Sequence, residues 1–245
     1  MKVSIIIPAH NEASTVDRVI RSVLEVAMPG WERELIIVDD GSTDGTGKIL
    51  EIWKKQKDTI LNGRFKWCPV IIVEHEENMG KGAAIRTGLS RAAGDFVLIQ
   101  DADLEYNPND IPKLLSGIDH SESAIAVYGA RGVKRYPERG LHYVFGAWVL
   151  TWLVNVLYGS GLTDVYTGYK IFPTQVLKSL DLQSEGFEFE AEVSCRLLQR
   201  GIKILEIPIS YTPRNKDQGK HIGWFDAVKG FWTIIRLKFH GQKEI

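Results

Sequence analysis

Short apolar runs alternate with longer amphipathic segments through the first half of the chain. The runs predict buried strands at residues 3–7, 35–38, 70–73, 96–99 and 124–128. The segments between them carry apolar residues at helical spacing and predict helices at residues 13–27, 43–56, 80–93 and 108–115. Strands separated by helices predict right-handed crossovers and an α/β fold with a mostly parallel sheet. We therefore expect the ligand site at the carboxyl ends of these strands.

The second half of the chain is less regular. It predicts an apolar helix at 143–158, a strand at 169–172, a helix at 190–200, a strand at 202–211 and a terminal helix from about residue 222. We find no internal repeat and no linker between independent domains. The expectation is one domain over residues 1–221, followed by an amphipathic helix at 222–245 that is not a domain of its own.

Composition narrows the class of protein. The chain has 245 residues, of which 44% are hydrophobic and 25% charged, and these values are typical of a globular protein. Its net charge of -1 supplies no positive field for nucleic acid, which we do not expect as a partner. The two cysteines, Cys68 and Cys195, lie among apolar residues and are predicted to be reduced core thiols.

No targeting or membrane-spanning segment is predicted. The apolar run after Lys2 is shorter than the roughly 7–15 residues of a signal-peptide core. The longest apolar run, residues 143–158, is interrupted by Gly146, Thr151 and Asn155. As a helix it would extend for about 24 Å, whereas the hydrocarbon core of a bilayer is about 30 Å thick.

Carboxylates follow three of the predicted strands at the points where the strands end. They occur within residues 8–12, 39–46 and 101–105. Three such groups at one edge of a sheet would repel one another unless a cation or hydrogen-bond donors compensate. Asp101 and Asp103 can point to the same side if the chain turns, and Glu105 adds a third oxygen ligand. Hard oxygen ligands with room for phosphate oxygens favour Mg²⁺ or Mn²⁺.

Three neighbouring features have two interpretations each. Asp39 and Asp40 suit a turn and a helix cap, or Asp40 could accept hydrogen bonds from a nucleotide. Glu12 could bind a ribose hydroxyl or cap a helix. The glycines of residues 78–82 could admit a diphosphate to a helix start or could form a packing turn. No dinucleotide-binding glycine motif follows any strand.

The motifs together resemble the family-two glycosyltransferases of the GT-A (Rossmann-like) fold. The first set lies at residues 8–12, 39–46, 78–88 and 101–105. A second set is similar to the polyprenyl-phosphate branch, the dolichol-phosphate mannose synthases and their glucosyl relatives, and it lies at residues 129–131, 162–168, 186–190 and 206–220. The resemblance covers nearly the whole chain. A sugar nucleotidyltransferase would instead need a Gly-rich, Arg-containing loop after the first strand, which residues 8–12 lack.

The resemblance implies a nucleotide-diphosphate sugar donor and a divalent metal, Mg²⁺ or Mn²⁺. It implies metal ligation by Asp101, Asp103 and Glu105, and catalytic roles for Asp101, Asp103 and Arg131. It implies contacts to the nucleotide sugar from Pro8, His10, Glu12, Val38, Asp40, Asp101, Ala102, Asp103, Arg131, Arg214 and Lys220. His10 stands where many relatives carry an aromatic residue, so the base, guanine or uracil, stays open.

The nature of the acceptor decides whether a general base is needed. Inverting transfer to a sugar hydroxyl needs one, and relatives of that type carry an Asp motif near residues 186–190. A polyprenyl phosphate is already an anion, with a second pKa of about 6, and needs only positioning. This chain has Glu188 and Glu190 in that segment but no Asp. We therefore expect transfer of a hexose, favouring mannose from GDP-mannose, to a polyprenyl or dolichyl phosphate. The alternatives are glucose or GlcNAc from a UDP-sugar, or a hydroxyl acceptor with Glu188 as base.

Two apolar helices point to a lipid. Between residues 141 and 163, His142 is the only residue of the Asp, Glu, Lys, Arg or His type. That helix has a less apolar stripe at Ala147, Thr151 and Asn155, and it is either a buried core helix or a lipid-facing one. The terminal helix is predicted to gather Trp224, Val228, Phe231, Trp232, Ile235 and Phe239 on one side. Residues 211–245 carry seven Lys or Arg and three acids, hence a net charge of +4.

We expect a cytoplasmic protein, peripheral on the cytoplasmic face of a membrane, bound directly or through a membrane-embedded partner subunit.

Overall fold

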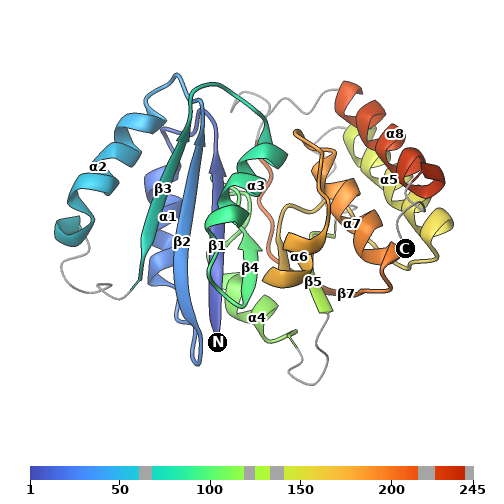
Figure 1. Ribbon diagram of the computed structural model, residues 1–245, viewed down its shortest axis with the longest axis horizontal. Helices are drawn as coiled ribbons and strands as arrows, with labels where there is room; N and C mark the ends of the chain where they lie inside the picture. Colours follow the sequence, from blue (N-terminus) through green and yellow to red (C-terminus); the bar gives the residue numbers. More distant parts are fainter. Residues whose placement is uncertain (61–67, 119–124, 133–140, 215–223, 241–245) are drawn as a thin grey trace.

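The computed structural model describes residues 1–60, 68–118, 125–132, 141–214 and 224–240. Seven strands form one sheet between two layers of helices (Figure 1). The strands are β1 (Lys2–Ala9), β2 (Glu32–Asp40), β3 (Val70–His75), β4 (Phe96–Ile99), β5 (Ile125–Ala130), β6 (Lys170–Pro173) and β7 (Lys203–Pro208). The helices are α1 (Val16–Glu25), α2 (Thr46–Ile60), α3 (Lys81–Arg91), α4 (Ile111–Leu115), α5 (Leu141–Tyr158), α6 (Thr174–Ser179), α7 (Phe189–Gln199) and α8 (Trp224–His240).

The sheet has the order β3-β2-β1-β4-β6-β5-β7. β1 pairs in parallel with β2 and β4, β2 with β3, and β5 with β7. β6 runs antiparallel to both of its neighbours, β4 and β5. The prediction of a mostly parallel sheet flanked by helices is thus confirmed, with β6 as the exception. The carboxyl ends of β1, β2 and β4 meet at one edge.

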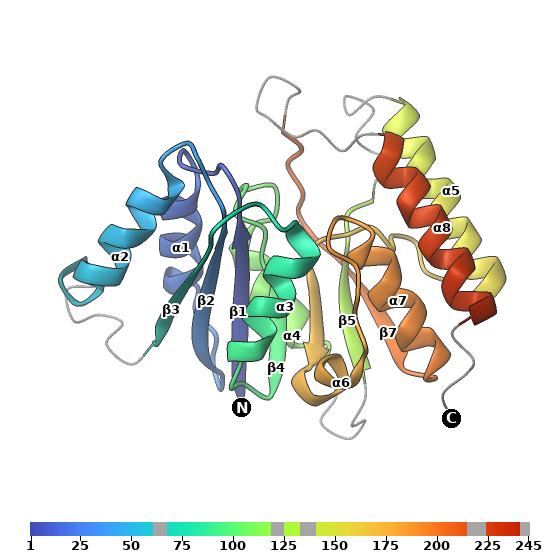
Figure 2. The ribbon, with the colours of Figure 1, turned by 45° about the horizontal axis from the view of Figure 1, so that its top comes forward.

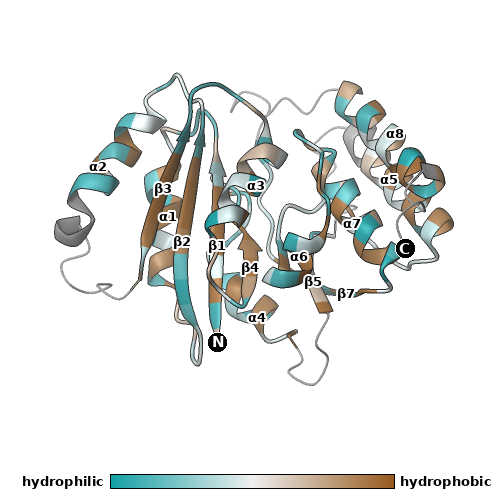
Figure 3. Cartoon of the chain, viewed as in Figure 1, coloured by the Kyte–Doolittle hydropathy of each residue, from teal (hydrophilic) through white to brown (hydrophobic). Residues whose placement is uncertain are grey.

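The strands are largely hydrophobic (Figure 3), and their apolar side chains join core clusters on both faces of the sheet, as expected for buried parallel strands. Along β1, Ile5 and Ile7 join the core under α1, α2 and α4, and Ile6 joins the core under α3, α6 and α7. These side chains are fully buried. The two packed layers hold the strand ends in fixed positions, and so they position the site.

Some predicted bounds differ from the structure. The first helix begins at Val16 rather than at residue 13, and the second begins at Thr46 rather than at residue 43. The amides of Glu12 and Ala13 donate hydrogen bonds to side chains of the next loop, to Thr46 Oγ1 at 2.8 Å and to Asp44 Oδ2 at 3.0 Å. The short helix α6 was not predicted, because six residues carry too little periodicity.

A third apolar cluster joins α5, α7 and α8 at one end of the molecule, where α5 and α8 lie side by side (Figure 2). A Cβ at Gly230 of α8 would lie 2.0 Å from the hydroxyl oxygen of Tyr166, so a larger residue there would force that side chain to shift. Cys195 lies in the cluster and Cys68 in the main core, and both are free, buried thiols, as predicted. Burial raises the pKa of Cys68 to about 11 and that of Cys195 to about 12.

The outer faces of α5 and α8 carry large apolar side chains. Exposed residues are Phe145, Trp148, Trp152 and Val156 on α5, with Phe225, Val228, Phe231, Trp232 and Phe239 on α8. We call these residues the α5/α8 apolar face. The less apolar stripe of α5 points inward, since Thr151 is buried and Asn155 bonds both main-chain groups of Leu162. Among the described residues, no helix has both the length and the apolar character needed to cross a bilayer.

Candidate active site

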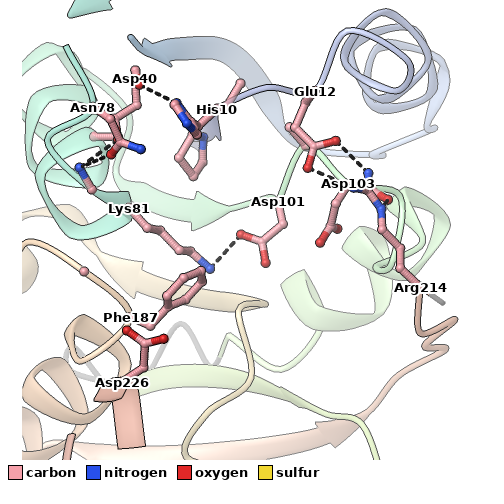
Figure 4. A pocket seen from close by; sticks show the side chains of 16 residues that line it. His10, Glu12, Asp40, Asn78, Lys81, Asp101, Asp103, Phe187, Arg214 and Asp226 are labelled. Atoms are coloured by element: carbon pink, nitrogen blue, oxygen red, sulfur yellow. Dashed lines mark hydrogen bonds and ion pairs between the residues drawn. The ribbon is translucent and has the colours of Figure 1, made fainter. Parts of the chain in front are cut away.

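A cavity of about 430 Å³ lies at the carboxyl ends of β1, β2 and β4 (Figure 4). Eight of the residues implicated by sequence line it: Pro8, His10, Glu12, Asp40, Asp101, Ala102, Asp103 and Arg214. Val38 does not, because its side chain is fully buried in the core under α3. Lys220 falls outside the described residues. The cavity therefore lies where we expected a ligand site, at the carboxyl ends of the parallel strands.

Asp40 organises the loop between β3 and α3. Its carboxylate accepts hydrogen bonds from the amides of Met79 at 2.9 Å and Gly80 at 2.8 Å, and it lies 2.7 Å from His75 Nδ1. Gly41 follows with a φ of 63°, and a Cβ there would collide with the main chain of Glu77. The turn interpretation thus holds for this segment. The implied nucleotide contact of Asp40 stays a prediction.

His10 and Glu12 follow β1, line the cavity and each have a defined side-chain contact. Nδ1 of His10 lies 2.7 Å from the carbonyl oxygen of Asp40, which can only accept, so this nitrogen carries a proton. The carboxylate of Glu12 is paired with Arg214, with distances of 3.0 Å to Nη1 and 2.7 Å to Nη2. Glu12 Oε2 also accepts a hydrogen bond from Thr15 Oγ1 at 2.7 Å. The Glu12–Arg214 pair closes this side of the cavity.

Glu105 holds the segment that carries Arg214. Its carboxylate accepts hydrogen bonds from the hydroxyl of Tyr211 at 2.8 Å and from the amide of Arg214 at 3.0 Å. The guanidinium of Arg214 also donates to the carbonyl oxygen of Asp103 at 2.8 Å. Glu105 is fully enclosed and does not line the cavity. Its observed contacts are therefore those of a positioning residue.

The two aspartates fit a divalent cation better than the predicted set of three ligands does. Asp101 and Asp103 both line the cavity, and Asp103 Oδ1 accepts the amide of Glu105 at 3.0 Å. Within the described ranges, no group of three or more His, Cys, Asp or Glu is arranged to hold a metal. Mg²⁺ usually takes one or two carboxylates and completes its shell with substrate phosphates and water. The donor set of Asp101 and Asp103 meets that requirement, and Glu105 is turned away.

Lys81 is a cavity residue that sequence reasoning missed. Its Nζ lies 2.7 Å from Asp101 Oδ1 and 3.1 Å from Glu190 Oε1. Burial disfavours the charge of Lys81, but the carboxylates of Asp101 and Glu190 outweigh burial and raise its pKa above the ordinary value. Glu190 is also paired with the fully buried Lys170, whose pKa burial lowers. The sequence did contain a signal for Lys81, because it lies between two glycines at the predicted start of a helix.

The glycines around Lys81 serve packing. The amides of Gly82 and Ala83 donate to the carbonyl oxygen of Glu185 at 2.6 and 3.2 Å. A Cβ at Gly82 would collide with the carbonyl oxygen of Ser184. Of the two interpretations of residues 78–82, the structure supports the packing turn, because a protein carbonyl already occupies the first amides of α3.

Arg131 is not among the residues that line the cavity, and its expected phosphate contact stays a prediction. Its guanidinium makes two hydrogen bonds to the carboxylate of Asp164, both at 2.7 Å, and stacks 5.3 Å from the ring centroid of Tyr211. Both members of the pair are buried. The arginine therefore joins the end of β5 to the loop that follows α5.

Three further cavity residues come from the second half of the chain. They are Gly186 and Phe187, before α7, and Asp226, in the first turn of α8. Figure 4 shows Phe187 and Asp226 on the same side of Lys81. Beside them, Glu188 Oε1 accepts the amide of Gly186 at 3.1 Å, and its buried Oε2 has no hydrogen-bond partner within the described part of the chain. The helical periodicity of residues 222–245 gave no sign that Asp226 would reach the cavity.

Comparisons with known proteins find a family and several relatives. Residues 4–177 match the family described as Glycosyl transferase family 2. An uncharacterized protein of Methanocaldococcus jannaschii is 31% identical, with 84% of this chain and 86% of that protein covered. A dolichol-phosphate mannosyltransferase of Pyrococcus furiosus is 27% identical, and the match covers 99% of this chain but only 65% of that protein.

Solved structures share the fold. The glucosyl-3-phosphoglycerate synthase of Mycobacterium tuberculosis, crystallised with Mn²⁺, uridine diphosphate and phosphoglyceric acid, gives a TM-score of 0.69 at 21% identity. The superposition covers 97% of this chain and 78% of the synthase. At this identity the likeness establishes the fold alone, and it confirms the predicted GT-A architecture.

Proposed function

Because the chain belongs to glycosyl transferase family 2, we propose that it transfers a hexose from a nucleoside-diphosphate sugar to a polyprenyl phosphate, with inversion at the anomeric carbon. GDP-mannose is the favoured donor and a dolichyl phosphate the favoured acceptor. The name of the Pyrococcus furiosus relative supports this choice. The proposal concerns this chain alone, since that relative is longer.

One helix carries the proposal, because it borders both the cavity and the apolar surface. Asp226 of α8 lines the cavity, and Phe225, next to it in sequence, is 63% exposed. Phe231 and Trp232 continue the exposed surface along the same helix. A lipid phosphate needs its head group at the donor and its chain in an apolar phase. The arrangement of α8 supports an acceptor of that kind.

The chain's own residues would bind and orient both substrates. Pro8, His10, Glu12 and Asp40 would form the nucleotide side of the cavity. Asp101 and Asp103 would hold Mg²⁺ or Mn²⁺, which when bound neutralises charge that develops on the leaving diphosphate. Arg214, with Lys220 from outside the described residues, would add positive charge there. The acceptor phosphate would attack as an anion and needs no base.

A second candidate function is transfer to a hydroxyl group with Glu188 as general base. The observation in its favour is the buried Glu188 Oε2 that has no hydrogen-bond partner among the described residues. Glu188 follows Gly186 and Phe187, which line the cavity. The M. tuberculosis structure, solved with phosphoglyceric acid, shows that this fold also holds an acceptor of another kind. The donor in this second function could be a UDP-sugar instead of GDP-mannose.

The two functions differ in their products. Purified protein would be incubated with GDP- and UDP-sugars, Mg²⁺ or Mn²⁺, and short-chain dolichyl phosphate, and lipids analysed by mass. We expect a glycosyl phosphate lipid that disappears with EDTA and returns with added metal. The Glu188→Gln variant should retain this activity, since a phosphate acceptor needs no base. Donor hydrolysis without glycolipid, or transfer to a sugar hydroxyl that Glu188→Gln abolishes, would contradict the proposal.

We further propose that the α5/α8 apolar face rests on the cytoplasmic surface of an anionic membrane. Its aromatic and aliphatic side chains are exposed, and Lys229 and Arg236 are exposed on the same helix, α8. Aromatic residues and basic side chains on one helix suit the lipid head-group region. The charge complementarity favours lipid over a membrane-embedded partner subunit.

If the α5/α8 apolar face binds the membrane, substitutions within this face should weaken vesicle binding, whereas substitutions elsewhere on the surface should not. Trp152 and Trp232 are 52% and 62% exposed, and replacing both by Glu removes two apolar anchors. At roughly 1.5–3 kcal/mol for each buried side chain, the partition coefficient should fall by about a hundredfold or more. Co-sedimentation with vesicles of phosphatidylcholine and phosphatidylserine measures it. Ile52→Glu on α2 is the matched control, because Ile52 is 50% exposed but lies far from this face, and it should bind normally. Failure of the unmodified protein to bind would favour a partner subunit.

A further inference from the structure

Four side chains of alternating charge lead into the cavity, and two of them, Lys170 and Glu190, are buried. Lys170 pairs with Glu190, Glu190 Oε1 lies 3.1 Å from Lys81 Nζ, and Lys81 Nζ lies 2.7 Å from Asp101 Oδ1. Lys170 and Glu190 are fully enclosed, whereas the side chains of Lys81 and Asp101 each retain 13% exposure. The series therefore ends at the cavity, on one of the two carboxylates proposed to hold the metal.

The Lys81–Asp101 pair is confined from behind. A Cβ at Gly168 would lie 2.5 Å from Asp101 Oδ2 and 3.0 Å from Lys81 Nζ, so the main chain of Gly168 packs directly against both groups. The main chain next to Lys81 is also fixed, because the amide of the preceding residue, Gly80, donates a hydrogen bond to the carboxylate of Asp40. The ammonium group can therefore move only by rotation of its own side chain, toward Glu190 or into the cavity.

We propose that Lys81 is a displaceable counter-ion that occupies Asp101 until metal and donor arrive together. An ammonium group and a divalent cation compete for the same carboxylate oxygen, and they repel each other at short range. Glu190 and the incoming diphosphate would offer Lys81 alternative partners. This inference rests on the proposed metal role of Asp101 and adds a coupling to it.

The coupling has a thermodynamic consequence. Metal binding without nucleotide must break the Lys81–Asp101 pair, and no phosphate oxygen is present to compensate for the lost contact. Once a diphosphate is present, both cations gain phosphate oxygens as partners. Metal should therefore bind weakly alone and more tightly with nucleoside diphosphate, and part of that difference should come from Lys81.

The test measures Mn²⁺ affinity of the nucleotide-free protein, by electron paramagnetic resonance of the unbound ion. Lys81→Gln keeps a donor for Asp101 but removes the charge. We expect it to bind Mn²⁺ about tenfold more tightly than the unmodified protein, within the usual range of site-to-site coupling. The gain on adding GDP or UDP should shrink accordingly. Tightening of less than about twofold, or weaker binding, would overturn the proposal.

Arg214→Gln separates displacement from a general change in charge. Like Lys81→Gln, this variant removes one cationic side chain from the cavity wall. It leaves one acid, Glu12, without its arginine partner. Its guanidinium contacts the main-chain oxygen of Asp103, and no described contact joins it to the Asp101 carboxylate. We expect its Mn²⁺ affinity to change by less than about threefold. Equal tightening in both variants would overturn the proposal.

Two further measurements keep the test independent of variant folding and of the transfer reaction. If Lys81→Gln fails to give a cooperative thermal transition, Lys81→Met is measured in the same way. A crystal of the unmodified protein soaked in Mn²⁺ should show Lys81 Nζ beyond hydrogen-bond distance of Asp101, with the ion on Asp101. Persistence of the pair with Mn²⁺ on Asp101 would refute displacement. Absence of Mn²⁺ from Asp101 even with nucleotide would refute the proposed metal role instead, and loss of glycolipid formation would leave these binding results unaffected.

Discussion

The Asp103→Asn variant is expected to lose hexosyl transfer by about a thousandfold while keeping its fold. Asp103 lines the cavity at the carboxyl end of β4, and its side chain is not part of an apolar cluster. Asn retains an oxygen that can accept the amide of Glu105, as Asp103 Oδ1 does at 3.0 Å. It lacks the negative charge that holds a divalent cation. Initial rates of donor consumption and glycolipid formation measure the loss.

The same change at the other end of β4 supplies the control. Asp95 is exposed just before the strand begins, and its carboxylate accepts the amide of Lys2 at 2.8 Å. Asp95→Asn should transfer hexose at the unmodified rate. Both variants should melt within a few degrees of the parent. Undiminished turnover in Asp103→Asn would remove Asp103 from the proposed metal site.

The Asp164→Ala variant is expected to lose about 3–5 kcal/mol of its free energy of unfolding. The carboxylate of Asp164 makes two hydrogen bonds of 2.7 Å to the guanidinium of Arg131, and both residues are buried. Removal of Asp164 takes from the buried Arg131 the carboxylate that accepts two of its hydrogen bonds. Urea denaturation followed by circular dichroism measures the change, provided that the transition remains two-state.

Two comparisons make that result interpretable. Asp181→Ala removes an exposed aspartate and should change stability by less than about 0.5 kcal/mol. The double variant Arg131→Met with Asp164→Leu removes both charges, and it should recover part of the lost stability because no unpaired charge remains. A loss below about 1 kcal/mol in Asp164→Ala would show that the pair contributes little to stability.

The fold could be predicted from sequence where the signal is local. The apolar runs gave the strands β1 to β4, because a fully buried strand is apolar on both faces. The direction of β6 could not be obtained in this way. The residues of Lys170–Pro173 have the same periodicity in either orientation, and the antiparallel pairing depends on the path of the chain between β5 and β6.

The site could be predicted as far as the strand ends locate it. Asp101 and Asp103 follow a strand directly, so the topology alone brings them to the cavity. The partners of other residues depend on contacts distant in sequence. Arg131 meets Asp164, and Lys81 meets Glu190, across separations that no local pattern encodes. The resemblance assigned a phosphate contact to Arg131, which stays a prediction, and it gave no indication of the buried ion pair with Asp164.

The order of strands in the sheet also bears on how the protein is made. The strands β3, β2, β1 and β4 all come from the first 99 residues, but β4 borders β6, which arrives only at residues 170–173. Until then the apolar β4 has an unpaired edge, which is a template for aggregation during synthesis. Phe187, Arg214 and Asp226 complete the cavity later still. A nascent chain should therefore form the side of the cavity that follows β1, β2 and β4 first, and it should become competent for transfer only after α8 has left the ribosome.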